Sequence, residues 1–252
     1  MNVQRLEGEP NNNLSQAPNI LGYVIFITYI FVMKYTVDKN YFEQIDTREK
    51  AYILGFIYGD GCITNKNYTT LAIGVKDRDI LEFIKKALNY SGPVRRYDRN
   101  KGYIHSLRIT NKKLATDLKK HGVVPNKSKV LKFPTGLKDK LILPFIFGLF
   151  DSDGYIYIPD EDCKWKQYRK LGFSGTKSVV RGVKNELEKH GFSKTSLKLE
   201  KCGTYTTHYV CKHVEMFNEL YKESPYKLKR KFKKFKDNEI VYTRLKGQDK
   251  CT

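Results

Sequence analysis

Two acidic residues, Asp60 and Asp153, stand in the same local context, and both could bind a divalent metal ion. Each is followed by a glycine, and each comes five residues after another glycine, Gly55 or Gly148. The residues before each acid are mostly apolar and aromatic, so each carboxylate is expected at the C-terminal end of a buried helix. A helix C-terminus is slightly negative and therefore favours a cation. Carboxylate oxygens are also hard ligands, which makes Mg²⁺ or Mn²⁺ the expected cofactor.

The helices and strands that must position these acids are predicted to occur twice along the chain, in the same order. The window 51–63 resembles the window 144–156, and each is followed by a strand, a helix, a hairpin and a last helix. In the first half these elements are the strand 68–75, the helix 79–88, the hairpin 94–109 and the helix 112–121; in the second half they are the strand 169–176, the helix 179–190, the hairpin 196–210 and the helix 214–222. The repeated order α-β-β-α-β-β-α predicts an α+β fold made by tandem duplication.

The duplication also sets the predicted domain boundaries. We expect an N-terminal extension (1–46), a first repeat (47–133), a linker (134–140), a second repeat (141–236) and a C-terminal tail (237–252). The extension is expected to be an accessory helix or a poorly ordered leader. Its apolar run, residues 20–33, is shorter than the roughly 20 residues that a membrane span needs, so no membrane partner is expected.

The charge of the chain predicts its partner. Lys and Arg outnumber Asp and Glu by 47 to 27, which gives a net charge of +20. Such an excess repels itself in a compact chain unless a polyanion is nearby, and nucleic acid is the commonest such polyanion. The five cysteines form no C-x-x-C pair and their number is odd. This pattern argues against a disulfide framework and predicts an intracellular, reducing compartment, either the cytoplasm or an organelle matrix.

The two Gly-x-x-x-x-Asp-Gly windows, Gly55–Gly61 and Gly148–Gly154, resemble the motif of the LAGLIDADG homing endonucleases. Two copies in register resemble the single-chain branch of that family, and the resemblance covers roughly residues 47–236. Two departures stand out, because Tyr58 replaces the first acid of the motif and Ser152 replaces a small apolar residue. Neither departure affects the terminal acid of the motif.

The resemblance implies both a fold and an activity. The motif helices would pack side by side at a pseudo-two-fold axis, and each repeat would form a saddle-shaped antiparallel sheet that lies in the DNA major groove. The protein would act as a monomer that hydrolyses double-stranded DNA at a long, asymmetric site. The backbone carbonyls of Gly59 and Ser152 would join Asp60 and Asp153 as metal ligands.

A basic residue near each acid would stabilise the charge on the reacting phosphate. Repeat position gives Lys76 with Lys177 as one candidate pair, and Lys127 with either Lys231 or Lys229 as another. Contacts to bases and phosphates are expected from the polar and basic residues of the hairpins, of the loop in the second half and of the C-terminal basic tract. These are Arg95, Arg96, Arg99, Lys101, Arg108, Lys166, Tyr168, Lys198, Lys201, Lys229 and Arg230.

Two other functions remain open on the same scaffold. One is an RNA-binding maturase, for which intron RNA would be the partner. The other is a DNA-binding protein that no longer cleaves, although the presence of both Asp60 and Asp153 argues against it.

Overall fold

The structure is a computed structural model that describes residues 35–64, 70–100, 102–159 and 169–235. The chain divides into two compact units, Met1–Thr36 and Val37–Thr252, and every helix and strand named below lies in the second unit. The predicted apolar run 20–33, the candidates Lys101, Lys166 and Tyr168, and the C-terminal tail 237–252 lie outside the described residues.

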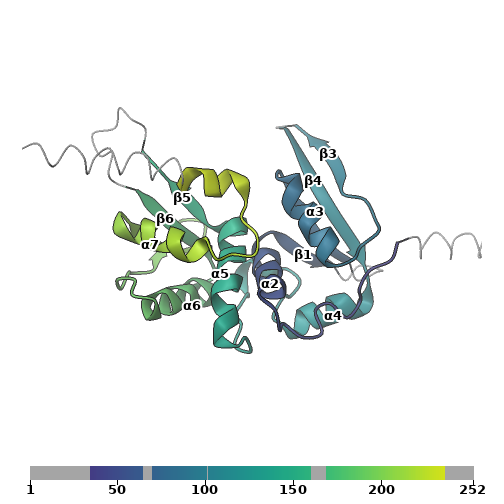
Figure 1. The fold of residues 1–252 in the computed structure, drawn as a ribbon, viewed down its shortest axis with the longest axis horizontal. Coiled ribbons are helices and arrows are strands. Elements are labelled where there is room, and N and C mark those ends of the chain that lie inside the picture. Colours follow the sequence, from purple (N-terminus) through teal and green to yellow (C-terminus); the bar gives the residue numbers. More distant parts are fainter. Residues whose placement is uncertain (1–34, 65–69, 101, 160–168, 236–252) are drawn as a thin grey trace, which may run out of the picture. The chain divides into compact units, whose positions relative to one another are not determined.

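The second unit contains the predicted series of elements twice (Figure 1). The first repeat consists of α2 (Arg48–Asp60), β1 (Gly61–Thr64), β2 (Thr70–Val75), α3 (Arg78–Ala87), β3 (Arg95–Arg99), β4 (Gly102–Thr110) and α4 (Lys112–Lys120), followed by the short 3₁₀ helix η1 (Lys127–Lys129). The second repeat consists of α5 (Asp139–Asp153), β5 (Tyr155–Tyr157), β6 (Lys170–Gly175), α6 (Lys177–Lys189), β7 (Lys198–Leu199), β8 (Tyr205–Val210) and α7 (Lys212–Tyr221). Residues 229–235 are also helical.

The motif helices α2 and α5 lie side by side and touch through their backbones (Figure 1). A Cβ atom on Gly55 would lie 1.9 Å from the carbonyl oxygen of Phe145, and one on Gly148 would lie 1.9 Å from that of Tyr52. Every residue of α2 from Ala51 to Tyr58 is buried or lacks a side chain, which explains why this helix is apolar on all sides. Both helices therefore form the shared core of the two repeats.

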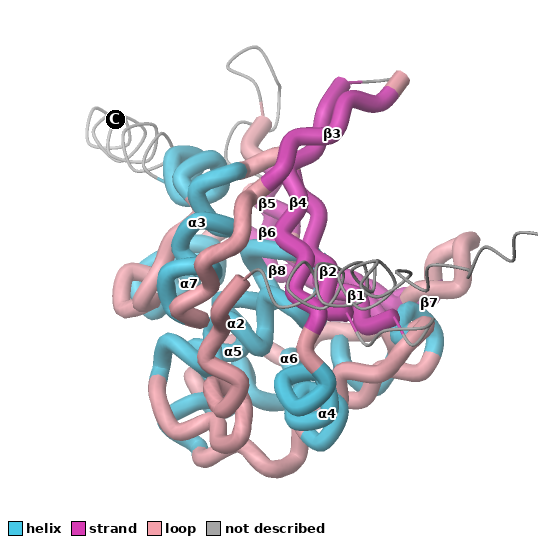
Figure 2. The backbone as a smooth tube through the Cα atoms, turned by 90° about the vertical axis from the view of Figure 1, so that its right-hand side faces the viewer, coloured by secondary structure: helices cyan, strands magenta, loops and turns pink. Residues whose placement is uncertain are grey.

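Each repeat adds one antiparallel four-stranded sheet to this core, in the orders β1-β2-β4-β3 and β5-β6-β8-β7. In β4, Leu107 and Ile109 point into the core, whereas the neighbouring Arg108 is exposed on the opposite face. The strands of the first sheet lie to one side of α2 and α3 in Figure 2. One face of each sheet is thus covered by its own helices, and the other is left open.

The predicted fold class is confirmed, with two differences at the domain boundaries. Residues 37–46, which the sequence assigned to an N-terminal extension, belong to the second compact unit, where Tyr41, Phe42 and Ile45 are buried. This segment is a series of turns without helix or strand periodicity, so its apolar residues gave no sequence signal. In addition, α5 begins at Asp139, which shortens the predicted linker 134–140.

Candidate active site

The two candidate metal ligands lie together at the ends of the motif helices. Asp60 is the last residue of α2 and Asp153 is the last residue of α5. A Cβ atom on Gly59 would lie 2.9 Å from the carboxyl carbon of Asp153 and 2.1 Å from Ser152 Oγ. The carboxyl group of Asp153 therefore lies beside the residue that precedes Asp60. The crossing of α2 and α5 brings together two acids that are far apart in the sequence.

The two carboxylates also interact electrostatically. Burial, and next the charge of Asp153, raise the pKa of Asp60 to about 6, while Lys231, Lys127 and Arg230 act in the opposite direction. Burial likewise raises the pKa of Asp153, and Lys127 and Lys231 again oppose the shift. Two acids that repel each other in a partly desolvated place are a favourable site for a cation.

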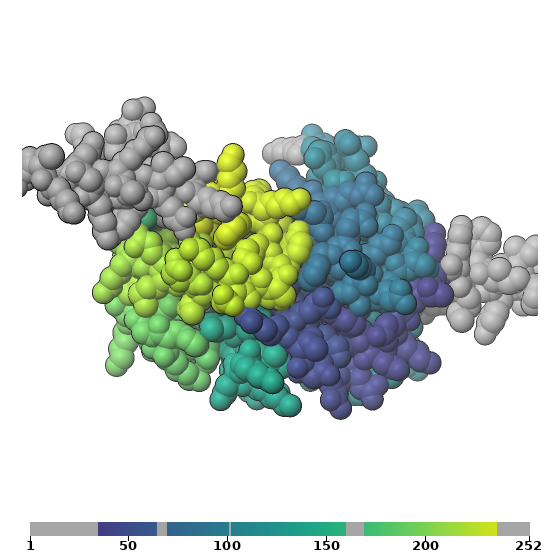
Figure 3. Space-filling view, in the orientation of Figure 1, coloured from purple at the N-terminus to yellow at the C-terminus, as the bar shows by residue number. Residues whose placement is uncertain are grey.

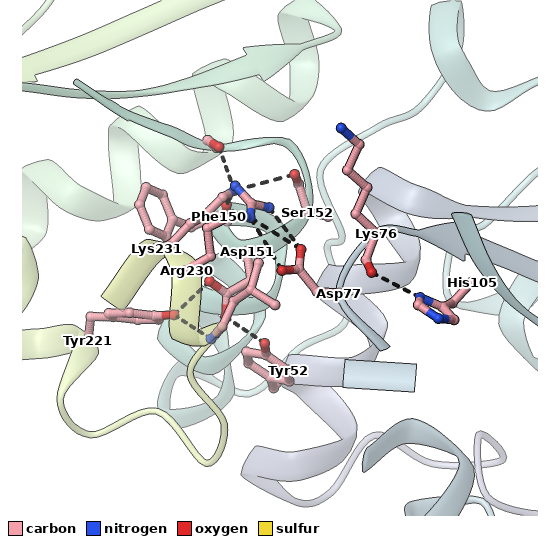
Figure 4. A network of polar contacts seen from close by, with 12 residues as sticks. Tyr52, Lys76, Asp77, His105, Phe150, Asp151, Ser152, Tyr221, Arg230 and Lys231 are labelled. Carbon is pink, nitrogen blue, oxygen red and sulfur yellow. Dashed lines mark hydrogen bonds and ion pairs between the residues drawn. The ribbon is translucent and has the colours of Figure 1, made fainter. Parts of the chain in front are cut away.

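Two lysines hold equivalent positions at the ends of the motif helices. Lys127 Nζ donates hydrogen bonds to the carbonyl oxygens of Tyr58 and Gly59. Lys231 Nζ donates to the carbonyl oxygens of Phe150, of Gly154 at 2.5 Å and of Ser152 at 3.4 Å (Figure 4). Each lysine therefore satisfies the last carbonyls of one motif helix, where a cation is favoured.

The choice between Lys229 and Lys231 that the sequence left open is decided by geometry. The side chain of Lys231 is 5% exposed, and burial lowers the pKa of its ammonium group to about 8. Burial also lowers the pKa of Lys127. Lys229, in contrast, is highly exposed and pairs with Asp79 at 3.4 Å. Lys231 is therefore the structural equivalent of Lys127.

The other predicted pair, Lys76 and Lys177, occupies different surroundings. Lys76 is exposed after the end of β2, and its carbonyl oxygen lies 3.0 Å from His105 Nδ1 (Figure 4). Lys177 is exposed at the start of α6, with its Nζ 5.6 Å from the centre of the Tyr205 ring. The main causes of the pKa shifts of Asp60 and Asp153 include Lys127 and Lys231 but neither Lys76 nor Lys177.

The oxygen atoms around the two acids suit a hard divalent cation. The carbonyl of Gly59, a predicted ligand, accepts a hydrogen bond from Lys127 and keeps a second lone pair. No group of three or more His, Cys, Asp or Glu side chains that could hold a metal occurs among the described residues. Mg²⁺ needs only one or two carboxylates besides water and phosphate oxygens, so this pair is sufficient. An open cavity is lined by Lys127, Asp153 and Thr176, so that Asp153 is reached from the side of the second repeat.

A third acid, Asp151, is part of the site's support and was not singled out from the sequence. Its buried carboxylate accepts hydrogen bonds from Tyr52 Oη and Tyr221 Oη, both at 2.6 Å, and from the backbone N of Leu228 at 3.2 Å (Figure 4). Burial raises the pKa of Asp151 to about 6, and the two tyrosine hydrogen bonds oppose the shift. Asp151 thereby joins α2, α5, α7 and the segment that carries Lys231.

The predicted DNA-contacting residues of the first sheet divide between its two faces. The pairing of β3 with β4 and of β4 with β2 places Arg95, Arg99 and Arg108 on the open face, together with Tyr97. Arg96 lies on the other face, where its guanidinium group is 4.3 Å from the centre of the Tyr103 ring. The alternation of side chains along a strand makes this division unavoidable for neighbours such as Arg95 and Arg96.

The predicted DNA-contacting residues of the second repeat lie in two places, the second sheet and the C-terminal basic tract. Lys198 shares a face with Lys170, which the sequence did not single out, and Lys201 lies in the turn after β7. Arg230 and Lys229 instead pair with acids at the start of α3: Arg230 with the N-cap residue Asp77 at 3.0 Å, and Lys229 with Asp79 at 3.4 Å. The structure thus brings Arg230 and Lys229 to a contact between the repeats.

Comparisons with known proteins agree with this geometry. A family model of the LAGLIDADG-like domain matches residues 48–122. No curated protein sequence matches the chain.

In the described part of the chain, no helix has the length and apolar character to cross a membrane.

Several solved structures share the fold of both repeats. The homing endonuclease I-WcaI bound to its DNA recognition sequence has a TM-score of 0.56 and 20% identity, over 77% of this chain and 91% of that one. The LAGLIDADG meganuclease I-AabMI bound to uncleaved DNA has a TM-score of 0.54 and 15% identity, over 78% and 91%. The LAGLIDADG homing endonuclease I-GzeII in complex with a DNA target has a TM-score of 0.52 and 14% identity, over 80% and 92%. The predicted resemblance is confirmed: residues 48–122 match the LAGLIDADG-like domain, and the chain shares the two-repeat fold of solved LAGLIDADG homing endonucleases.

Proposed function

We propose that the protein is a site-specific double-strand DNA endonuclease that uses Mg²⁺ or Mn²⁺ to hydrolyse phosphodiester bonds. The observation that carries the proposal is the meeting of Asp60 and Asp153 at the ends of α2 and α5, with Lys127 and Lys231 beside them. The similar solved structures of I-WcaI, I-AabMI and I-GzeII, which are bound to DNA, support DNA as the partner.

Each residue of the site has a defined part in such a reaction. A bound divalent ion would activate water and neutralise the charge on the reacting phosphate. Asp60 and Asp153 would hold that ion, with the carbonyls of Gly59 and Ser152 beside them. Lys127 and Lys231 place a positive charge on either side, where it stabilises the negative charge that develops on the phosphate oxygens. Because carbonyl oxygens hold both ammonium groups, these charges are oriented before DNA binds.

DNA recognition is assigned to the open faces of the two sheets. A β ribbon fits into the major groove, where each base pair presents a distinct pattern of donors and acceptors. The first sheet offers Arg95, Tyr97, Arg99 and Arg108, whereas the second offers Lys170 and Lys198. Because the two faces differ, the recognised site should be asymmetric. Both acids come from one chain, so a monomer is sufficient for cleavage.

We also propose an intracellular, reducing location, as the cysteine pattern predicts. Cys62, Cys202 and Cys211 are free thiols and all three are exposed. Exposed free thiols are stable where the surroundings keep them reduced.

The proposal is tested by incubating the protein with a randomised DNA library, with and without Mg²⁺, and sequencing the products. We expect double-strand cuts at one sequence family, only with metal. Asp60→Asn and Asp153→Asn should each abolish double-strand cleavage, because one carboxylate fewer weakens metal binding, while DNA binding stays largely intact.

Asp46→Asn is the matched control, since this exposed acid pairs with Lys50 away from the site and its loss should leave cleavage unchanged. Full cutting by Asp60→Asn or Asp153→Asn would refute the assigned roles. Binding to DNA without any cutting would favour the non-cleaving protein. Selective binding of intron RNA without DNA cleavage would favour the maturase.

A further inference from the structure

The segments that carry the two lysines make an unusual set of contacts. We define the first arm as residues 121–138, between α4 and α5, and the second arm as residues 222–235, after α7. The first arm carries Lys127 and the second carries Lys231, and each lysine binds the motif helix of its own repeat. Each arm also packs within its own repeat, as Phe235 does against Phe150 and as His121 does in accepting a hydrogen bond from Tyr58 Oη. Other contacts of each arm reach the opposite repeat.

The second arm docks on α3, in the first repeat. The ring of Tyr226 stacks on that of Phe83, with 4.7 Å between the ring centres and 27° between their planes. Arg230 pairs with Asp77 at 3.0 Å, and Lys229 pairs with Asp79 at 3.4 Å. Figure 3 shows the yellow C-terminal segment in direct contact with the blue segment of the first repeat.

The first arm docks on α6, in the second repeat. Thr176 Oγ1 donates a hydrogen bond to the carbonyl oxygen of Leu131 at 2.5 Å, and the backbone N of Phe133 donates to Ser178 Oγ at 3.2 Å. The ring of Phe133 fills the space beside Gly182, where a Cβ atom would lie 2.1 Å from the ring carbon Cγ.

The two docking sites use equivalent positions of equivalent helices. Asp77 and Thr176 are the N-cap residues of α3 and α6. Asp79 and Ser178 follow two residues after these caps, and Phe83 and Gly182 follow six residues after them. One aromatic ring of the arm lies at the last position in both cases: Tyr226 stacks on Phe83, and Phe133 fills the space that Gly182 leaves. The arms are therefore exchanged between the repeats in a reciprocal way.

We propose that docking on the opposite repeat positions each arm's lysine, so that Asp77 is a positioning residue for Lys231 and Gly182 is one for Lys127. The inference rests on the proposed function for its consequence in catalysis, but the docking itself can be tested without cleavage. Each half of the active site is then correctly built only when the other half is folded. This coupling favours cutting both strands over cutting one.

Two substitutions disturb one arm each. Asp77→Asn removes the ion pair with Arg230, while Asn remains a good N-cap for α3, where the Asp77 side chain makes no cap hydrogen bond. Gly182→Ala would raise the helix propensity of α6 but displaces the ring of Phe133. The matched controls are Glu82→Gln, which removes an exposed ion pair of the same helix α3, and Gly136→Ala, which adds a methyl group in open space.

The first readout is the rate at which an amine-acylating reagent modifies each lysine, measured by peptide mass spectrometry on metal-free protein without DNA. Asp77→Asn should speed the modification of Lys231 by about threefold, as expected for the loss of an exposed ion pair, and leave Lys127 unchanged. Gly182→Ala should speed the modification of Lys127 and leave Lys231 unchanged. Asp77→Glu, which keeps the carboxylate, should restore the slow rate. Equal effects on both lysines, or no effect on either, would overturn the inference.

The second readout is the cleavage rate of each DNA strand in a single turnover on the site found with the library. Asp77→Asn should slow cleavage of the DNA strand whose cleavage Lys231→Met slows most. Gly182→Ala should slow cleavage of the strand whose cleavage Lys127→Met slows most. Equal slowing of both strands would contradict specific positioning. If the unaltered protein cuts no DNA, the proposed function fails, but the acylation rates still decide whether the arms position the lysines.

Discussion

Asp60 carries a negative charge at a position where its surroundings oppose that charge. Burial and the neighbouring Asp153 together raise its pKa from 3.8 to about 6, even though three cations lie near enough to oppose the shift. A carboxylate in this state is well placed to bind a cation but weakens the metal-free fold. The same residue would therefore favour function and disfavour stability.

We predict that Asp60→Asn stabilises the metal-free protein at neutral pH. The folded protein binds the Asp60 proton more tightly than the unfolded chain does, so the free energy of unfolding falls as the pH rises from about 4 to about 6. A shift of about two pKa units corresponds to about 1–3 kcal/mol once partial exposure is considered. Denaturant unfolding in EDTA should therefore show the gain at pH 7.5 and lose it near pH 4.

Two comparisons make this prediction specific to the site. Asp46→Asn removes an exposed acid that pairs with Lys50, and it should show no such gain at pH 7.5. Mg²⁺ should raise the unfolding free energy of the unaltered protein, because it binds the folded state only, and should do so less for Asp60→Asn. A loss of stability at pH 7.5 in the metal-free variant would contradict the argument.

Single residues differ in how far the sequence reveals them. The meeting of Asp60 and Asp153 was predictable because each ends a repeated motif, so their types and spacing carried the signal. Asp151 was not found, because its role depends on Tyr52, Tyr221 and Leu228, which come from three separate segments. No local pattern around Asp151 encodes those partners.

The pair of motif helices is the element on which both half-sites depend. α2 and α5 touch at Gly55 and Gly148, where no side chain fits between the backbones. We predict that Gly55→Ala destabilises the fold by about 3 kcal/mol or more, because its methyl group would meet the carbonyl oxygen of Phe145. In an isolated helix the same change would stabilise. Thermal unfolding measures the effect.

The control for this prediction is Gly136→Ala, which meets no atom within 4 Å and should leave the unfolding temperature nearly unchanged. If Gly55→Ala proved as stable as the unaltered protein, the helices would have to be further apart than the structure shows. A stable Gly55→Ala protein with reduced cleavage would point to a shift of Asp60 relative to Asp153.

Helices and strands were predictable to within a few residues, and the family resemblance implied that the motif helices pack together, whereas the register of the strands was not predictable. The helical spacing of apolar residues and the alternation in β4 gave the order of elements in both repeats. The face on which each basic residue lies follows from strand register, which only the pairing of β3 with β4 fixes. For that reason Arg95 and Arg96 were grouped together from the sequence, and the structure separates them.

The positive charge of the whole molecule is distributed unevenly between its faces. On the helices, many lysines have acidic partners, as Lys113 has in Asp117 and Lys184 has in Glu188. On the open sheet faces, Arg95, Arg99, Arg108 and Lys170 make no ion pair with another described residue. A polyanion would bind at these positively charged faces. The net charge of +20 would thus attract it to one side of the molecule.

The last prediction follows from this distribution and concerns binding of the DNA site at different salt concentrations. The logarithm of the affinity should fall steeply and linearly with the logarithm of the salt concentration, with a slope that reflects roughly 6–10 phosphate contacts. Arg95→Ala should reduce that slope by about one, because Arg95 lies on the open face. Arg96→Ala is the matched control on the same strand, since Arg96 lies on the other face, paired with Asp98 and close to Tyr103. Equal losses in the two variants would mean that DNA does not follow the open face, and a flat salt response would count against DNA as the partner.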